Sequence, residues 1–147
     1  MKESKKITTT LSYLKGTVRI SLNTLQALGE PKYIALMINQ NDSTIAYIGT
    51  SKNDRSALKV RYDNISTLKA GKVVCSVKFV RKVFKLEGWD SNFRYRMSGK
   101  YIDEANIVYF NLKKAYQVSN SSSDDDVDDY IDPEYDIDLK EVNGNGE

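Results

Sequence analysis

The chain contains no histidine, and it has only one cysteine among its 147 residues. The missing histidine excludes a Ser-His-Asp triad, histidine acid–base catalysis and histidine-ligated metal. A single cysteine forms no internal disulfide and no thiolate cluster. Cys75 lies in the apolar run Val73-Val74-Cys75, which predicts a buried structural thiol. Because no catalytic constellation is visible, we expect neither an enzyme nor a bound metal or cofactor.

Long apolar runs are also missing, since none approaches the length of a membrane span. The N-terminal Met-Lys-Glu-Ser-Lys-Lys lacks the apolar core of a signal peptide. We therefore expect a cytoplasmic protein without membrane contact. The length suits one domain with a proper core.

Charge is divided unevenly along the chain. Residues 1–117 hold 21 basic and 9 acidic side chains, a net charge of +12, whereas residues 118–147 hold 1 and 11, a net charge of −10. A basic body favours polyanionic partners, and an acidic tail serves either solubility or regulation.

A strand, a capped helix and a hairpin are predicted in succession from Gly16 onwards. The strand is Thr17–Ile20, and the Ser21 hydroxyl is expected to cap a helix in which leucines recur at helical spacing. Gly29 ends that helix. A hairpin is expected over residues 33–49, followed by a strand over residues 58–62 with one basic face.

The second half repeats this order. Lys72–Cys75 is the strand, Ser76 the expected cap, and Val77–Leu86 a longer helix ending before Gly88. Phe93–Tyr101 and Asn106–Leu112 form the second hairpin. The run Ile45-Ala46-Tyr47-Ile48 matches Ile107-Val108-Tyr109-Phe110, which predicts that Tyr47 and Tyr109 occupy equivalent positions in the two units. The fold class predicted is mainly β (α+β), a small barrel of two strand–helix–hairpin units in pseudo-twofold arrangement.

The domain boundaries follow from this repeat. Residues 1–13 are expected to be a polar, basic arm, with an edge strand as the alternative, and residues 14–118 the barrel domain. Unit one covers residues 14–62 and unit two residues 72–118. Residues 119–147 are predicted to be a disordered acidic tail.

The first unit contains Val-x-Ile-x-x-x-x-Leu-x-x-Leu-Gly, and with its order of elements it resembles the AbrB-like swapped-hairpin family over residues 14–50. That resemblance implies a small DNA-binding barrel built from two such units, supplied by two chains or, as in MraZ-type proteins, by two repeats. The family usually has proline where this chain has Ser21, and often arginine at Thr17, Leu25 and Gln26. The resemblance therefore bears more on the fold than on DNA-contacting residues.

Basic residues gather on one side of the second helix and on one face of the strand that follows it. This arrangement is typical of a phosphate-binding surface, although a merely solvated lysine-rich face is the alternative. The candidate nucleic-acid-binding residues are Lys15, Arg19, Lys59, Arg61, Lys78, Arg81, Lys82, Lys85, Arg94, Arg96 and Lys100. Aromatic side chains could stack on single-stranded bases. For most of the strand tyrosines (Tyr33, Tyr47, Tyr95 and Tyr109) we expect sheet packing instead.

The tail mixes carboxylates with apolar side chains, a pattern typical of a short motif that folds on a partner. Its candidate partner-binding residues are Asp124, Asp125, Asp126, Asp128, Asp129, Tyr130, Ile131 and Tyr135. It could compete with nucleic acid for the basic face, recruit a protein, or keep the body soluble.

Three functions remain open from the sequence. The first is a DNA-binding regulatory protein whose acidic tail tunes affinity or recruits a protein partner. The second is a phage or mobile-element protein that inhibits a host nucleic-acid enzyme, with the tail as a DNA mimic. The third is a single-strand-binding accessory protein. Whether two copies form a homodimer is left open as well.

Overall fold

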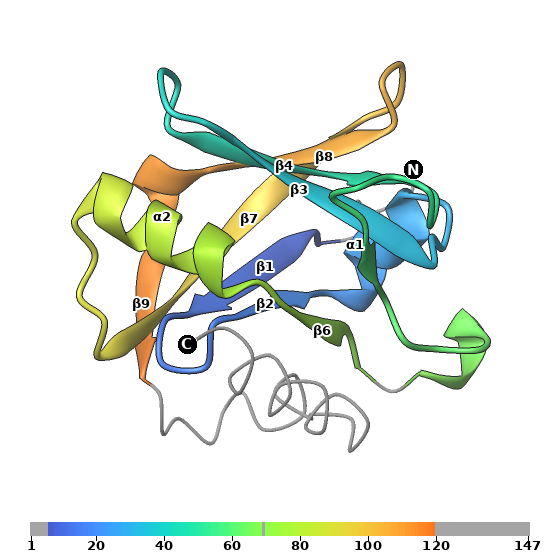
Figure 1. Ribbon diagram of the computed structural model, residues 1–147, viewed down its shortest axis with the longest axis horizontal. Helices are drawn as coiled ribbons and strands as arrows, with labels where there is room; N and C mark the ends of the chain where they lie inside the picture. Colours follow the sequence, from blue (N-terminus) through green and yellow to red (C-terminus); the bar gives the residue numbers. More distant parts are fainter. Residues whose placement is uncertain (1–5, 69, 120–147) are drawn as a thin grey trace.

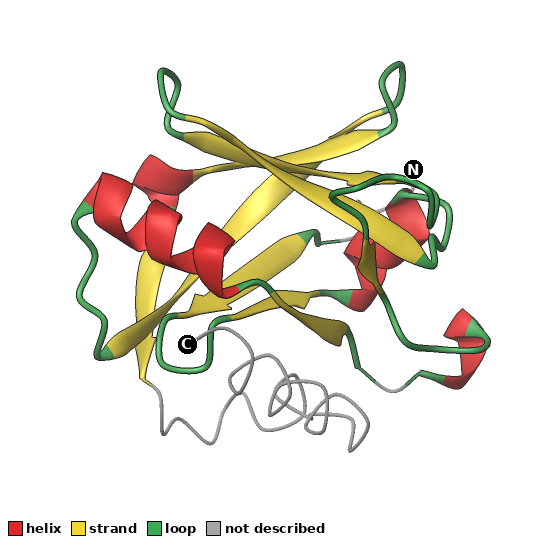
Figure 2. Ribbon diagram, viewed as in Figure 1, coloured by secondary structure: helices red, strands yellow, loops and turns green. Residues whose placement is uncertain are grey.

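The computed structural model describes residues 6–68 and 70–119. Antiparallel strands make up most of this part of the chain, and the helices lie at the sides of the sheet (Figures 1 and 2). In chain order the elements are β1 (Thr8–Ser12), β2 (Thr17–Ile20), α1 (Leu22–Ala27), β3 (Tyr33–Asn39), β4 (Thr44–Gly49), β5 (Leu58–Lys59), η1 (Ile65–Thr67), β6 (Lys72–Cys75), α2 (Val77–Glu87), β7 (Phe93–Ile102), β8 (Ile107–Asn111), η2 (Leu112–Lys114) and β9 (Tyr116–Ser119).

The strands form a nearly closed antiparallel barrel in the order β5-β3-β4-β8-β7-β1-β2-β6, with β9 paired to β7. The long strand β7 joins two halves of this sheet. Its first part pairs with β1 and β9, and its last part pairs with β8. We call the half formed by β9, β7, β1, β2 and β6 the lower sheet. The half formed by β5, β3, β4, β8 and the end of β7 is the upper sheet.

Two chain segments of the same design interleave to make the barrel. β2 pairs with β6 and β4 pairs with β8, so equivalent strands of the two units meet across a pseudo-twofold axis. The strand that precedes each unit also pairs with a strand of the other unit. β1 pairs with β7 of the second unit, and β5 pairs with β3 of the first. The mainly β barrel of two strand–helix–hairpin units is thus confirmed.

A pair of glycines marks the same symmetry. Gly16 and Gly71 each precede the first paired strand of a unit and lie against the other unit at the start of its helix. A Cβ on Gly16 would lie 2.6 Å from the Val77 side chain, and one on Gly71 would lie 2.0 Å from the Ile20 carbonyl oxygen. Only glycine allows backbones to approach this closely.

The two helices begin differently although serine precedes both. Ser21 caps α1, since its hydroxyl accepts a hydrogen bond from the Thr24 amide at 3.2 Å. Ser76 holds the N-cap position of α2, but its side chain makes no capping bond, so the predicted cap is wrong there. The predicted stop is confirmed, because Gly88 closes α2 in the left-handed conformation at φ 66°.

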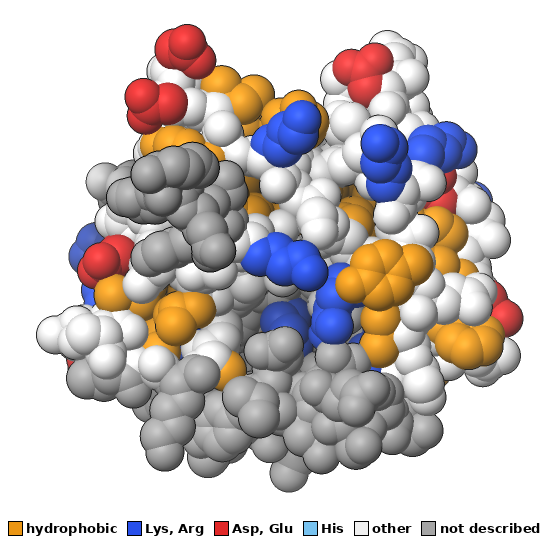
Figure 3. All heavy atoms as spheres, turned by 180° about the vertical axis from the view of Figure 1, so that it is seen from behind, with side chains coloured by type: hydrophobic (Ala, Val, Ile, Leu, Met, Phe, Trp, Pro, Cys, Tyr) orange, Lys and Arg blue, Asp and Glu red, His pale blue; other side chains and the backbone are white. Residues whose placement is uncertain are grey.

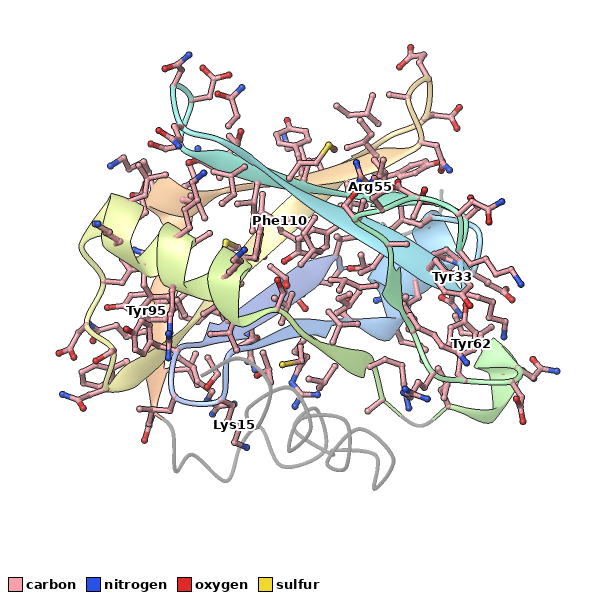
Figure 4. All side chains as sticks on the ribbon, viewed as in Figure 1. Lys15, Tyr33, Arg55, Tyr62, Tyr95 and Phe110 are labelled. Carbon is pink, nitrogen blue, oxygen red and sulfur yellow. The ribbon has the colours of Figure 1, made fainter. Side chains whose placement is uncertain are left out.

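The core lies between the two half-sheets, and it corrects the predicted match between the closing strands. Tyr47 and Phe110 (the latter labelled in Figure 4) are both fully buried, with ring centroids 4.9 Å apart. Ser43 and Asn106 take the same positive φ in the two hairpin turns, which makes Phe110 the equivalent of Tyr47. Tyr109 is half-exposed on the opposite face, because a slip of one residue reverses the side of the sheet.

The N-terminal arm was predicted wrongly. Residues 8–12 form β1, which lies between β2 and β7, and Leu11 is fully buried. Threonine suits such a position because its β-branched side chain favours strands and its hydroxyl can bond locally. β1 therefore belongs to the barrel domain, ahead of the predicted start at residue 14.

Two smaller expectations also change. The strand expected over residues 58–62 is only two residues long, Leu58–Lys59, and it pairs with the hairpin of unit one as β1 pairs with that of unit two. By pairing, β5 thus opens unit two instead of closing unit one. Cys75 is half-buried and not fully enclosed.

Candidate nucleic-acid interface

Two predicted arginines lie side by side on the outer face of the lower sheet. Thr10 of β1 pairs with Arg19 of β2 on one side and with Arg96 of β7 on the other. Directly paired residues point to the same face, about 5 Å apart, so the two arginines flank Thr10 within about 10 Å of each other. The Arg96 Nε donates a hydrogen bond to the Thr10 Oγ1 at 3.0 Å. We call Arg19, Arg94, Arg96 and the neighbouring Lys6 the arginine surface.

A hollow of about 240 Å³ opens on this surface. Lys6, Arg19 and Arg96 supply cationic groups to its lining. The lining residues with a hydroxyl or amide side chain are Thr8, Thr9, Thr10, Ser21 and Asn23. Seen from behind, the molecule carries a group of Lys and Arg side chains near the centre of the view (Figure 3). Cations beside hydroxyl donors are the chemistry that binds phosphate or carboxylate oxygens.

Hydrogen bonds hold the N-terminal edge of the hollow in place. The Asn23 Nδ2 donates to the Lys6 carbonyl oxygen at 2.8 Å, and the Thr8 amide donates to the Ser21 hydroxyl at 3.2 Å. The Ser21 and Thr24 hydroxyls also bond each other at 2.7 Å. The serine that caps α1 therefore also fixes the start of β1, two residues after Lys6, beside the two arginines.

The strand under the arginine surface is tied to the core by a buried tyrosine. The Thr9 hydroxyl donates to the Arg19 carbonyl oxygen at 2.7 Å and also bonds the Tyr47 hydroxyl at 2.7 Å. Burial raises the pKa of Tyr47 far above its ordinary value, while the bond with Thr9 opposes this shift. The phenol stays neutral, and the backbone of Arg19 is anchored to the barrel interior.

The last strand brings a tyrosine to the arginine surface that the sequence did not single out. Tyr116 of β9 pairs with Arg96 and is 52% exposed. On the same face Arg94 is buried, and its guanidinium donates to the Ser119 carbonyl oxygen at 2.6 Å. The Tyr-x-Val alternation in residues 116–118 is a weak strand signal, and Lys6 carries no site signal because it lies in the segment predicted to be an arm.

The basic side of α2 forms a separate surface, contrary to the prediction that it continues the arginine face. Phe84 of α2 packs edge-on against Tyr95, with centroids 5.4 Å apart (Figure 4). Tyr95 alternates with Arg94 and Arg96 along β7, so helix and arginines lie on opposite sides of the sheet. The exposed cations of α2, which we call the helix surface, are Lys78, Arg81, Lys82 and Lys85.

The other predicted cations are spread over the molecule. Lys15 lies in the exposed β1–β2 turn (Figure 4). Lys59 is exposed on β5 and Arg61 is half-buried just after it. Lys100 points to the same side of β7 as Arg96 but lies in the upper sheet, opposite Tyr109. The predicted partner-binding positions from Asp124 to Tyr135 lie outside the described residues.

Within residues 6–68 and 70–119, no cluster of three or more histidine, cysteine, aspartate or glutamate side chains is arranged to hold a metal ion. Neither helix in these two segments has the length and apolar character needed to cross a membrane. No protein-family model, no curated protein and no solved structure matches the chain.

Proposed function

We propose that this chain is a DNA-binding regulatory protein whose arginine surface contacts the nucleic-acid backbone. The supporting observation is the row formed by Arg19, Thr10 and Arg96, with the polar hollow beside it. Guanidinium groups pair well with phosphate oxygens, and a hydroxyl between them adds a further donor. The resemblance to swapped-hairpin DNA-binding barrels is consistent with this proposal and stays a prediction.

The acidic tail lowers the affinity of this surface in the proposal. The chain leaves the barrel beside the arginines, because Ser119 accepts the hydrogen bond from Arg94. Three strand spacings, about 14 Å, separate β9 from β2. Five extended residues span about 17 Å, so Asp124 can reach Arg19. Carboxylates there compete with phosphate for the same cations.

A single-stranded target is the second candidate, and one observation favours it. Tyr116 stands beside Arg96 and more than half of its surface is exposed. A base can stack on an exposed tyrosine while an arginine contacts the adjoining phosphate. Duplex DNA offers no unstacked base to this ring.

The test is fluorescence anisotropy of the full chain with duplex and single-stranded DNA over a salt series. Replacing both Arg19 and Arg96 by Gln should weaken binding and reduce the slope of log K against log salt by about 2. The matched control removes two charges from the helix surface, with Lys78→Gln and Lys82→Gln, and should change the slope by less than about 1. Equal losses in the two variants would refute the assignment to the arginine surface.

A second full-length variant tests the tail. Asparagine in place of Asp124, Asp125, Asp126, Asp128 and Asp129 removes five charges and keeps the chain length. Competition predicts tighter DNA binding by this variant. Unchanged affinity would remove the tail from the proposal and leave the arginine surface untouched.

A further inference from the structure

Two neighbouring cross-strand rows on the outer face of the upper sheet are mostly apolar, while the row of Asn39, Thr44 and Asn111 beside them is polar. One cross-strand row runs Met37, Ala46, Tyr109 and Lys100, and the next runs Ala35, Ile48, Ile107 and Ile102. We call Met37, Ala46, Ile48, Ile102, Ile107 and Tyr109 the apolar face. Met37 and Ile102 are each 39% exposed, and the other four are half-buried.

The apolar face differs from the solvated side of an ordinary antiparallel sheet. Such a side is normally polar, because one face packs on the core and the other meets water. Here the core face is already formed by side chains such as Tyr47 and Val108, both fully buried. The opposite face nevertheless presents methionine, isoleucine and tyrosine. Aromatic residues and methionine are enriched in protein–protein interfaces.

The β3–β4 and β7–β8 hairpins project from the upper sheet on either side of this face (Figure 1). Their tips are acidic, with Asp42 in the β3–β4 turn and Asp103 and Glu104 in the β7–β8 turn. The cross-strand rows of the face carry one charged residue, Lys100. A second copy packed face to face can bring its acidic tips beside Lys100 while the apolar side chains meet.

We propose that the apolar face is the interface of a homodimer in solution. The face lies over the β4–β8 pair, where the pseudo-twofold axis passes. Both copies offer the same apolar rows, acidic tips and lysine, which an isologous twofold contact requires. The acidic tail of the same chain is a poor occupant, because residues 118–147 have a net charge of −10 and the hairpin tips would repel them.

The apolar face is small for a protein–protein interface. Four strands span about 14 Å, and two residue rows add about 10 Å, so the apolar floor alone covers roughly 140 Å². A standard interface buries about 800 Å² on each partner. The hairpin sides must therefore contribute, and the association is expected to be weak, with half-dimerisation in the micromolar range.

Sedimentation velocity of the full chain over a concentration series tests this dimer. The mass should rise from 16.7 kDa towards twice that value as concentration increases. Met37→Lys combined with Ile102→Lys should keep the protein monomeric throughout the series. Both positions are exposed, and a thermal melt with a transition like that of the parent chain confirms that the variant folds. Ile102→Ser, a milder change, should raise the dimer dissociation constant at least threefold.

The matched control introduces a lysine outside the apolar face. Leu14 is 66% exposed in the β1–β2 turn, away from the apolar face, and Leu14→Lys should leave dimerisation unchanged. A chain that stays monomeric up to about 1 mM contradicts the proposal. Equal disruption by Leu14→Lys contradicts it as well. Loss of the dimer in the tail variant with asparagines, while Met37→Lys has no effect, would assign association to the tail instead.

Discussion

The outer faces of the lower and upper sheets both present regular cross-strand rows of side chains. The row on the lower sheet is cationic and polar, whereas the row on the upper sheet is apolar. On the lower sheet the row across β7, β1 and β2 is Arg96, Thr10 and Arg19. On the upper sheet the row across β7, β8 and β4 is Ile102, Ile107 and Ile48. The same strand β7 supplies the first member of both rows.

A single strand thus carries cationic residues in one sheet and apolar residues in the other. A strand alternates sides every residue, so Arg94, Arg96, Lys100 and Ile102 all point outwards. Their partners differ, because β7 leaves β1 and β9 and joins β8 within its length. Gly99 lies at this passage, in close contact with the core.

The largest expected effect comes from Gly99, where the two faces are joined. A Cβ there would lie 2.5 Å from the Phe110 ring and 2.6 Å from the Tyr109 carbonyl oxygen. Gly99→Ala should lower the free energy of unfolding by about 3 kcal/mol, the upper end for overpacking. Urea denaturation measures it. Ser98→Ala, an exposed neighbour, should cost less than about 0.5 kcal/mol. Equal stability of the two variants would contradict this packing.

The next effect separates duplex from single-stranded DNA as the proposed target of the lower face. Tyr116→Ala should weaken binding of single-stranded DNA about tenfold, because a stacking contact is lost. Binding of duplex DNA should stay within about twofold, since no base is unstacked there. Tyr116→Phe keeps the ring and should behave like the parent chain in both anisotropy titrations. An equal loss on both targets would argue against stacking.

A smaller effect is expected at Tyr47, whose hydroxyl hydrogen-bonds β1 of the lower sheet from the core. Tyr47→Phe removes the buried bond to Thr9 and should cost about 1 kcal/mol of unfolding free energy. The pKa of Tyr47 is raised in the fold, so above about pH 10 the unfolded chain loses a proton that the fold keeps. The contribution of this tyrosine to the free energy of unfolding is therefore fully present below that pH. Above it the free energy of unfolding falls, by as much as about 1.4 kcal/mol per pH unit from this group.

The pH dependence supplies the check on this tyrosine. Unfolding curves of Tyr47→Phe should decline less steeply above pH 10 than those of the parent chain, because the variant lacks this proton. The exposed Tyr116→Phe serves as the comparison and should follow the parent chain more closely. Parallel curves for the parent chain and Tyr47→Phe would contradict the burial of a neutral phenol.

The smallest effect lies on the helix surface. Lys82 has like charges four residues before it and three residues after it, at Lys78 and Lys85. Lys82→Glu should raise the free energy of unfolding by a few tenths of a kcal/mol in low salt, since repulsion becomes attraction. The same change at Lys52, in an exposed loop, should not stabilise the protein. Thermal melts at low and high salt distinguish the two results.

Much of the fold was predictable from residue patterns. The alternation in both hairpins, the cap at Ser21 and the stop at Gly88 were read correctly because each depends on neighbours in the sequence. For residues 8–12 the sequence offers an edge strand only as an alternative to an arm, because Thr8, Thr9 and Thr10 are polar and only pairing with two other strands makes an inner barrel strand of them. The match of Tyr47 with Tyr109 failed because one residue of slip reverses the face.

The site was less predictable than the fold. Arg19 and Arg96 were both chosen, but their meeting across Thr10 depends on pairing between residues far apart in the chain. The α2 cations were expected beside them because they are near in sequence, whereas the sheet lies between. The apolar face is not predictable from the sequence, since hydrophobic alternation does not tell which side of a strand is the core.

The most direct test measures DNA binding and dimerisation together in one set of proteins, with variants of each face. Anisotropy with DNA and sedimentation velocity would be measured for the parent chain, for Arg19→Gln with Arg96→Gln, and for Met37→Lys with Ile102→Lys. Our account predicts that the arginine variant loses DNA affinity and still dimerises. The Met37 and Ile102 variant should be monomeric and should bind DNA normally below the dimerisation range. Loss of both properties in either variant would contradict the separation of the two faces.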